Sequence, residues 1–154
     1  MSYSVEVLWE KNPDETFVDN KYSRSHIWIF DGGIEVKASS SPHVVPLPFS
    51  NIHAVDPEEA FIAALSSCHM LWFLSIAAEK HYLVERYDDH AAGVLGKNDR
   101  GKLAMTRVTL CPEVVFGGSL IPSQEQIDEL HHLAHEACFI ANSVQTEIEI
   151  KPAV

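Results

Sequence analysis

The strongest constraint on the fold is a run of nineteen residues without a charged side chain, from Ala60 to Ala78, bounded by Glu59 and Glu79. A run of this length reaches the range of a membrane-spanning helix. Three serines and a histidine interrupt it, however, and no basic flank orients it. We therefore expect a soluble helix that is apolar on nearly every face and so is buried all round. Since one domain of this size rarely encloses a helix fully, we expect a partner subunit to complete its cover.

The residues before this run have the features of a helix start. Asp56 can cap the helix, and Pro57 suits the first helical position. Glu59 follows Asp56 at the spacing of a capping box. If Glu59 serves the cap, Glu58 is the carboxylate left free. We expect this helix to continue to about Lys80.

Alternating apolar and polar residues predict strands on both sides of the helix. The expected strands cover residues 5–9, 26–30, 34–38, 89–97, 106–116 and 147–150. A second helix is expected from Ser123 to about Cys138, because Ser123 and Gln126 have capping-box spacing and an apolar stripe follows. This order of elements predicts an α+β fold with a largely antiparallel sheet, in a single domain of residues 1–154.

Composition narrows the possible partners. The chain has 11 Lys and Arg against 22 Asp and Glu, a formal net charge of -11, and no basic cluster. Binding to nucleic acid or to an anionic membrane is therefore not expected. The N-terminal residues do not resemble an export signal, so the cytoplasm is the expected location. Three cysteines are too few for a disulfide scaffold, and any disulfide is expected to be a catalytic intermediate.

Two cysteines have positions suited to thiol chemistry. Cys68 lies in the middle of the first helix, and Cys138 lies seventy residues later at the end of the second. The negative end of a helix dipole disfavours a thiolate, so Cys138 suits a resolving thiol and Cys68 an attacking one. The alternative is that both cysteines are ordinary packing residues. Cys111 falls on a strand position and is interpreted as a bystander.

An attacking Cys68 needs a positive neighbour, because the thiolate is the nucleophile and a mid-helix position lacks the helix terminus that could lower its pKa. Of the four arginines, Arg24 is the best placed, just before a predicted strand. Glu58 lies ten residues before Cys68, on a neighbouring helix face. A carboxylate there could hold an arginine without touching the sulfur.

These residues carry a resemblance to a known family. The segments 56–68 and 138–142, together with Arg24 and the leading strands, resemble the OsmC/Ohr family over nearly the whole chain, and the OsmC-like branch more than Ohr. The resemblance implies an intertwined homodimer with antiparallel sheets wrapped around two long central helices. It also implies a hydroperoxide reductase with Cys68 as the peroxidatic cysteine, Cys138 as the resolving cysteine, Arg24 as the activating arginine and Glu58 as its carboxylate partner.

The family further implies reduction by a dithiol, such as a lipoylated protein, with no cofactor and no metal. Apolar residues expected around the site, Leu65, Trp72 and Phe139, favour an organic hydroperoxide over hydrogen peroxide, which remains a possible substrate.

Three other functions are compatible with the sequence. A non-enzymatic module of the same fold could bind a small apolar ligand while the cysteines only pack. A zinc site could use His131, His135 and Cys138, which recur on one helix face, with His69 beside Cys68. No second ligand pair is visible, however, and His131 is expected on a solvated face. A Cys-His hydrolase lacks any visible oxyanion hole.

Overall fold

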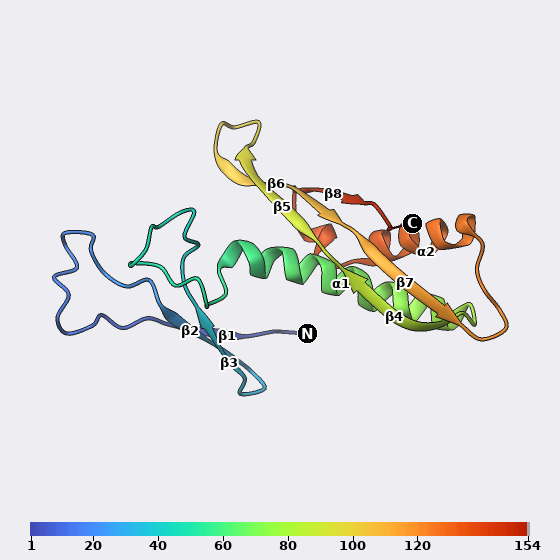
Figure 1. Ribbon diagram of the computed structural model, residues 1–154, viewed down its shortest axis with the longest axis horizontal. Coiled ribbons are helices and arrows are strands. Elements are labelled where there is room, and N and C mark those ends of the chain that lie inside the picture. The colour runs from blue at the N-terminus through green and yellow to red at the C-terminus, as the bar shows by residue number, and fades with distance from the viewer. Residues whose placement is uncertain (154) are drawn as a thin grey trace. The chain divides into compact units, whose positions relative to one another are not determined.

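The computed structural model describes residues 1–153 (Figure 1). The chain forms two compact units, Met1–Ala60 and the remainder from Phe61 onward, and each is described by itself. The single-domain prediction stays a prediction.

The first unit contains a three-stranded antiparallel sheet in the order β1-β2-β3. Its strands are β1 (Val5–Leu8), β2 (His26–Phe30) and β3 (Glu35–Ala38). The β2–β3 hairpin turns at Gly33, whose φ of 81° lies in the left-handed region that glycine adopts without strain. Its two strands correspond to the predicted strands 26–30 and 34–38.

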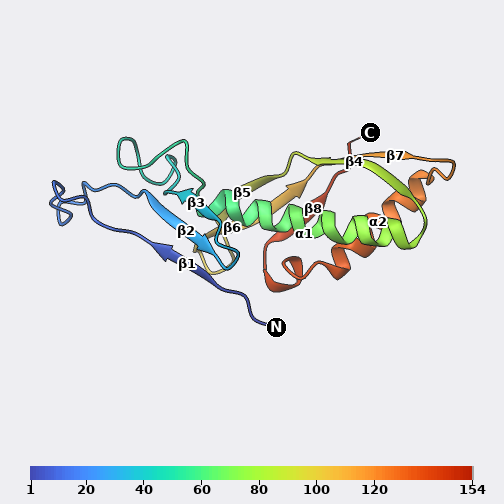
Figure 2. The ribbon, with the colours of Figure 1, turned by 90° about the horizontal axis from the view of Figure 1, so that it is seen from below.

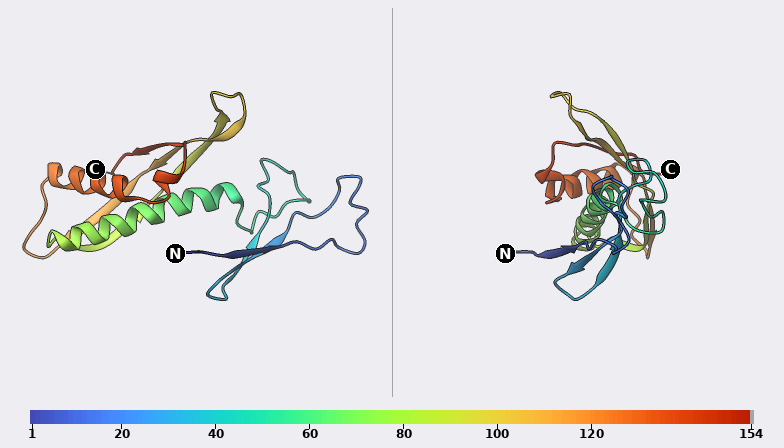
Figure 3. Two further views of the ribbon diagram at one scale, coloured as in Figure 1. Left: turned by 180° about the vertical axis from the view of Figure 1, so that it is seen from behind. Right: turned by 90° about the vertical axis from the view of Figure 1, so that its left-hand side faces the viewer.

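The sheet of the first unit is poorly covered. All four residues of β1 are exposed, and Val7 keeps 61% of its surface accessible. The buried residues of this unit are mostly small or polar: Ala38, Ser39, Ser41, Ser50 and Asp56. The strands are seen from two further sides in Figure 3. A sheet with so little buried apolar surface has a weak hydrophobic core of its own.

The second unit contains two sheets and two α-helices. The helices are α1 (Pro57–Glu79), which begins in the first unit, and α2 (Gln124–Ala137), followed by the short 3₁₀ helix η1 (Ala141–Ser143). One sheet pairs β4 (Leu83–Asp89) with β7 (Pro112–Gly117). The other has the order β5-β6-β8, from β5 (Ala92–Lys97), β6 (Leu103–Leu110) and β8 (Glu147–Ile150). All pairs are antiparallel except β6 with β8, which is parallel.

Both helices lie on the same side of these strands (Figure 2). One buried stripe of α1, formed by Leu65, His69, Phe73 and Ala77, recurs every four residues. Its C-terminal half packs against α2 and the β4–β7 pair, in a cluster of Phe73, Ala77, Leu130 and Ala134. Its N-terminal half packs against β6 through Leu65, Val108 and Leu110. The α+β class with two helices and largely antiparallel sheets is therefore confirmed.

One strand prediction was wrong, and one strand was missed. The run 106–116, expected as one strand, is two strands that break at Cys111 and belong to different sheets. Residues 83–89, most of which the sequence assigned to no element, form β4. The second half of the run, β7, pairs with β4, a partner that the local sequence does not reveal.

The opposite side of α1 is uncovered. The exposed residues there are uncharged and mostly small: Ala63, Ala64, Ser67, Leu71, Ser75 and Ala78. Within residues 1–153, α1 is the one helix long and apolar enough to cross a membrane. Core helices of soluble proteins share this length and composition. The expectation that α1 is buried all round therefore does not hold within this chain, and its cover by a partner subunit stays a prediction.

Candidate active site

The start of α1 has the cap that the sequence predicts. The Glu59 amide donates to Asp56 Oδ1 at 2.8 Å, and the Asp56 amide donates to Glu59 Oε2 at 3.3 Å. This reciprocal pair satisfies two helix-terminal donors. Glu58 is therefore free of the cap, and its Oε2 atom is buried without a hydrogen-bond partner. An unpaired buried carboxylate oxygen is costly, so a partner at this position would be stabilising.

The guanidinium of Arg24 is held by its own loop. It donates to the Tyr22 carbonyl at 2.5 Å and to the Asn20 carbonyl and side chain at 3.1 and 2.8 Å. It also stacks over the Tyr22 ring, 3.7 Å from the centroid. The backbone of Arg24 is anchored as well, since its amide donates to the Phe49 carbonyl and its carbonyl accepts from His26 Nδ1.

Arg24 and Glu58 line the same cavity in the first unit, which has a volume of about 530 Å³. Aromatic side chains form part of its wall: Trp9, Phe17 and Tyr22 pack with ring centroids 4.6 to 5.6 Å apart. No ion pair joins Arg24 to Glu58 among residues 1–153. Arg24 and Glu58 thus line one cavity, but the Arg24 guanidinium is bound to Asn20 and Tyr22 and not to Glu58.

Cys68 and Cys138 are neighbours in the second unit. Cys138, the C-cap residue of α2, is 1% exposed, whereas Cys68 is half-buried. Burial and then the adjacent Cys68 side chain raise the pKa of the Cys138 thiol to about 11. The Ala141 amide, which donates to Cys138 Sγ at 3.4 Å, lowers this pKa in part. Both cysteines are free thiols, and the raised pKa holds Cys138 in its protonated form at neutral pH.

Aromatic side chains flank this thiol pair. Trp72, one turn beyond Cys68 on α1, meets Phe139, the residue after Cys138, edge to face at 5.4 Å. Phe139 remains 66% exposed. The surroundings of the two thiols are therefore apolar and partly open.

A buried histidine pair lies between the two helices that carry the thiols. His69 Nε2 and His131 Nδ1 are 3.1 Å apart, and their rings are nearly parallel. The two side chains are 1% and 3% exposed. Their outer nitrogens, His69 Nδ1 and His131 Nε2, are buried without partners. Whichever ring donates the bridging proton, one outer nitrogen is left as a donor and the other as an acceptor.

Burial keeps both rings neutral. Desolvation, then the charges of His131 and His135, lower the pKa of His69 to about 3. Desolvation also lowers the pKa of His131 to about 4, although Asp128 and Asp89 oppose the shift. A neutral, hydrogen-bonded histidine pair therefore joins α1 to α2.

The sequence-based interpretation of His131 was wrong. It lies in the core against Phe73, with ring centroids 4.5 Å apart, and not on a solvated face. The sequence contained a signal for this burial. His69 falls between Leu65 and Phe73 in the buried stripe of α1, and His131 directly follows the buried Leu130 in α2. Within residues 1–153, no group of three His, Cys, Asp or Glu side chains converges in a way that could hold a metal ion.

Asp89 connects α1 to the strands near the site. The hydroxyl of Ser66 donates to Asp89 Oδ2 at 2.5 Å, and the Cys111 amide donates to Asp89 Oδ1 at 2.6 Å. The β6–β7 break at Cys111 is therefore fixed by its backbone. No role for the Cys111 thiol follows from these contacts.

The fold and the site define a class of protein: an α+β protein in which a long helix, uncharged from Ala60 to Ala78, brings a half-buried cysteine to a buried one at the end of a second helix. The chain belongs to the OsmC-like protein family, whose model matches residues 50–153. The family resemblance inferred from the sequence is confirmed.

Solved structures agree with this assignment. The chain is 57% identical to an OsmC-like protein of unknown function from Vibrio cholerae, with a TM-score of 0.98 and 99% of each chain covered. An OsmC-like protein from Mycoplasma pneumoniae is 16% identical, with a TM-score of 0.73 and coverage of 99% of this chain and 96% of the other. The organic hydroperoxide resistance protein OhrB of Bacillus subtilis is also 16% identical, with a TM-score of 0.68 and coverage of 99% and 98%. The last two similarities show the fold alone. No curated protein shows a significant match.

Proposed function

We propose that the protein is a thiol-dependent peroxidase that reduces organic hydroperoxides through a peroxidatic Cys68 and a resolving Cys138. The observation that carries the proposal is the meeting of these two thiols, one half-buried and one fully buried. Family membership supports a peroxide-related role, since structural relatives such as OhrB are named organic hydroperoxide resistance proteins.

The proposed cycle has three balanced steps. The Cys68 thiolate attacks the peroxide, breaks the O–O bond and becomes a sulfenic acid, while the leaving alkoxide takes a proton to form the alcohol. The Cys138 thiol then condenses with the sulfenic acid, forming the disulfide and releasing water. An external dithiol, such as a lipoylated protein, reduces this disulfide and is itself oxidised to a disulfide. The raised pKa of Cys138 suits it to wait as a thiol until the sulfenic acid forms.

Arg24 is proposed as the cation that activates Cys68, and Glu58 as the carboxylate that positions it. Support for the pairing of Arg24 with Glu58 comes from the cavity that these two residues share and from the unpaired Glu58 Oε2, which a guanidinium would satisfy. Cys68 does not line that cavity, so the activation of Cys68 rests on the family resemblance. Reaching Glu58 requires Arg24 to leave its contacts with Asn20 and Tyr22. The test is the pH dependence of Cys68 alkylation in Arg24→Ala and Glu58→Gln, which should shift to higher pH relative to the unmodified chain.

An organic hydroperoxide is the proposed substrate because the Trp72–Phe139 pair gives the thiols apolar surroundings. Desolvating an alkyl group there is favourable, whereas hydrogen peroxide gains nothing from it. Cumene hydroperoxide should therefore be reduced faster than hydrogen peroxide. Faster turnover of hydrogen peroxide would refute the preference.

A cytoplasmic homodimer is the proposed assembly. Two uncovered surfaces support it: the small-residue side of α1 and the exposed β1 strand. Burying such apolar surface against a second copy would supply the hydrophobic stabilisation that the single chain lacks. Analytical ultracentrifugation at micromolar concentration should give twice the mass of the chain, and a monomer would contradict the proposal.

The peroxidase proposal is tested by mass spectrometry after one equivalent of cumene hydroperoxide. A peptide linked through Cys68 and Cys138 is expected. Cys68→Ser should abolish turnover, Cys138→Ser should accumulate the sulfenic acid, and Cys111→Ser, the matched control, should behave as the unmodified chain. Oxidation at Cys111, or unchanged turnover in Cys68→Ser, would refute the assignment.

The second candidate is a non-enzymatic module that binds a small apolar ligand. The aromatic cavity beside Arg24 favours it, because aromatic walls with few polar groups are typical of ligand sites. The Cys68→Ser variant separates the two functions. If the unmodified chain reduces peroxide and folded Cys68→Ser does not, the peroxidase is supported. If the folded unmodified chain does not reduce peroxide either, the binding module is favoured.

A further inference from the structure

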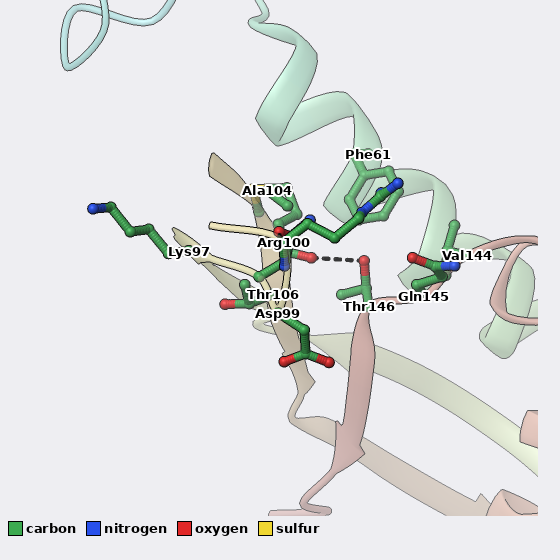
Figure 4. A pocket seen from close by; sticks show the side chains of 11 residues that line it. Phe61, Lys97, Asp99, Arg100, Ala104, Thr106, Val144, Gln145 and Thr146 are labelled. Atoms are coloured by element: carbon green, nitrogen blue, oxygen red, sulfur yellow. Dashed lines mark hydrogen bonds between the residues drawn. The ribbon is translucent and has the colours of Figure 1, made fainter. Parts of the chain in front are cut away.

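A cavity of about 830 Å³ lies in the second unit, at the tip of the β5–β6 hairpin, and the proposed peroxidase cycle does not use it (Figure 4). We refer to it as the hairpin cavity. Its lining comes from α1, the hairpin and the segment between η1 and β8: Phe61, Lys97, Asn98, Asp99, Arg100, Ala104, Met105, Thr106, Val144, Gln145 and Thr146. Its volume is within the range of small-molecule sites.

The hairpin cavity has an apolar part. Phe61 and Val144 pack on the cluster around Leu65, and Ala104 and Met105 belong to β6. Thr146 does not offer its hydroxyl hydrogen to a ligand, because Oγ1 donates to the Met105 carbonyl at 2.7 Å (Figure 4). An occupant therefore needs an apolar body to match this surface.

The rim carries unpaired positive charge. Arg100 extends from the hairpin toward the α1 side of the cavity, whereas Lys97 and Asp99 point outward (Figure 4). Within residues 1–153, the Arg100 guanidinium makes no hydrogen bond or ion pair; its backbone amide donates to Asn98 Oδ1 at 3.0 Å, which fixes the loop. A free guanidinium presents a planar fork of donors that matches a carboxylate.

The overall charge of -11 does not oppose an anion at this place. At physiological ionic strength, exposed charges are screened beyond roughly 8 Å, so the nearest groups decide the local potential. The charged residues that line the cavity are Arg100 and Lys97 against Asp99, an excess of one positive charge.

We propose that the hairpin cavity binds an amphipathic monocarboxylate, with its carboxylate on Arg100 and its alkyl chain along Phe61, Met105 and Val144. This class of ligand follows from one free guanidinium, that of Arg100, above an apolar surface. A polyphosphate would need several converging donors, and an uncharged apolar molecule would leave Arg100 unused. This site is separate from the thiol chemistry and does not depend on the proposed peroxidase function.

The probe is decanoate, titrated into the reduced full chain by isothermal titration calorimetry. One molecule per chain is expected to bind, and decanamide, which has the same alkyl chain and a neutral head, should bind at least tenfold more weakly. Arg100→Gln should weaken decanoate binding about tenfold, which corresponds to about 1.4 kcal/mol. Lys102→Gln is the matched control, since Lys102 is an exposed cation of the same hairpin that does not line the cavity.

A second variant tests the cavity itself. Ala104→Trp fills it without changing any charge and should abolish decanoate binding, while the melting temperature monitors the fold. The proposal is overturned if the unmodified chain does not bind decanoate, if decanamide binds equally well, or if Arg100→Gln or Ala104→Trp, in a folded protein, binds decanoate as the unmodified chain does.

Discussion

The buried pair His69–His131 should make the protein acid-sensitive at a pH where most proteins are still stable. Both side chains are almost fully buried and neutral in the folded state, with pKa values near 3 and 4 against 6.5 for an exposed histidine. Above pH 6.5 both states are neutral and the pair has no effect on stability. Below it, the unfolded chain binds two protons that the folded chain does not bind.

The magnitude follows from this linkage. Each histidine reduces the free energy of unfolding by about 1.4 kcal/mol for every pH unit below 6.5, until the folded-state pKa is reached. Between pH 7 and pH 5 the pair should therefore remove about 4 kcal/mol, a large part of a typical domain's stability. Asp89 from β4 and Asp128 from α2 limit the loss because they favour a charged His131, and His135 adds to it.

The assay is urea unfolding of the reduced protein at pH 7, 6 and 5, at one protein concentration. The double variant His69→Leu/His131→Leu removes the titrating pair and should lose most of the difference between pH 7 and pH 5. His132→Asn, a change at the exposed neighbour, should keep it. Carboxylates contribute equally in all three proteins, so equal pH dependence in the unmodified chain and the double variant would refute the reasoning.

Three further predictions concern local features. Because the pKa of Cys138 is raised to about 11, iodoacetamide at pH 9 should leave this thiol unlabelled in the native reduced protein; mass spectrometry showing full labelling would contradict the shift. A Cβ at Gly93 would lie 2.7 and 2.9 Å from two atoms of Ile62, so Gly93→Ala should lower the free energy of unfolding by about 1–3 kcal/mol, whereas Gly32→Ala, with open space around it, should have little effect. Asp56→Ala removes the cap of α1 and should cost about 1 kcal/mol in the same denaturation assay, and an unchanged midpoint would contradict the capping role.

Local sequence predicts the elements that depend on nearest neighbours. The α1 start was predictable because a cap needs only residues three positions apart, and Asp56 and Glu59 have that spacing. The second capping box, from Ser123 to Gln126, is confirmed for the same reason. By contrast, β4 could not be predicted, since Leu83–Asp89 is defined by its pairing with β7, a strand distant in the sequence.

The candidate site shows the same division. Cys68 and Cys138 could be predicted as a redox pair from their positions, because each lies at a defined place on a predicted helix. Their unequal burial, and the pKa that follows from it for Cys138, depend on η1 and on the packing of α2. The role of Arg24 as an activating cation stays a prediction.

Sequence alone determined the two helices, their caps, the positions of the thiols and the family. The tertiary structure decided which polar side chains are removed from water: His69 and His131 face each other only because α1 and α2 pack together. Free energies of protonation depend on solvation and on neighbours distant in the chain, and neither is encoded in a local pattern. The acid-sensitive pair and the hairpin cavity are therefore properties of the folded chain.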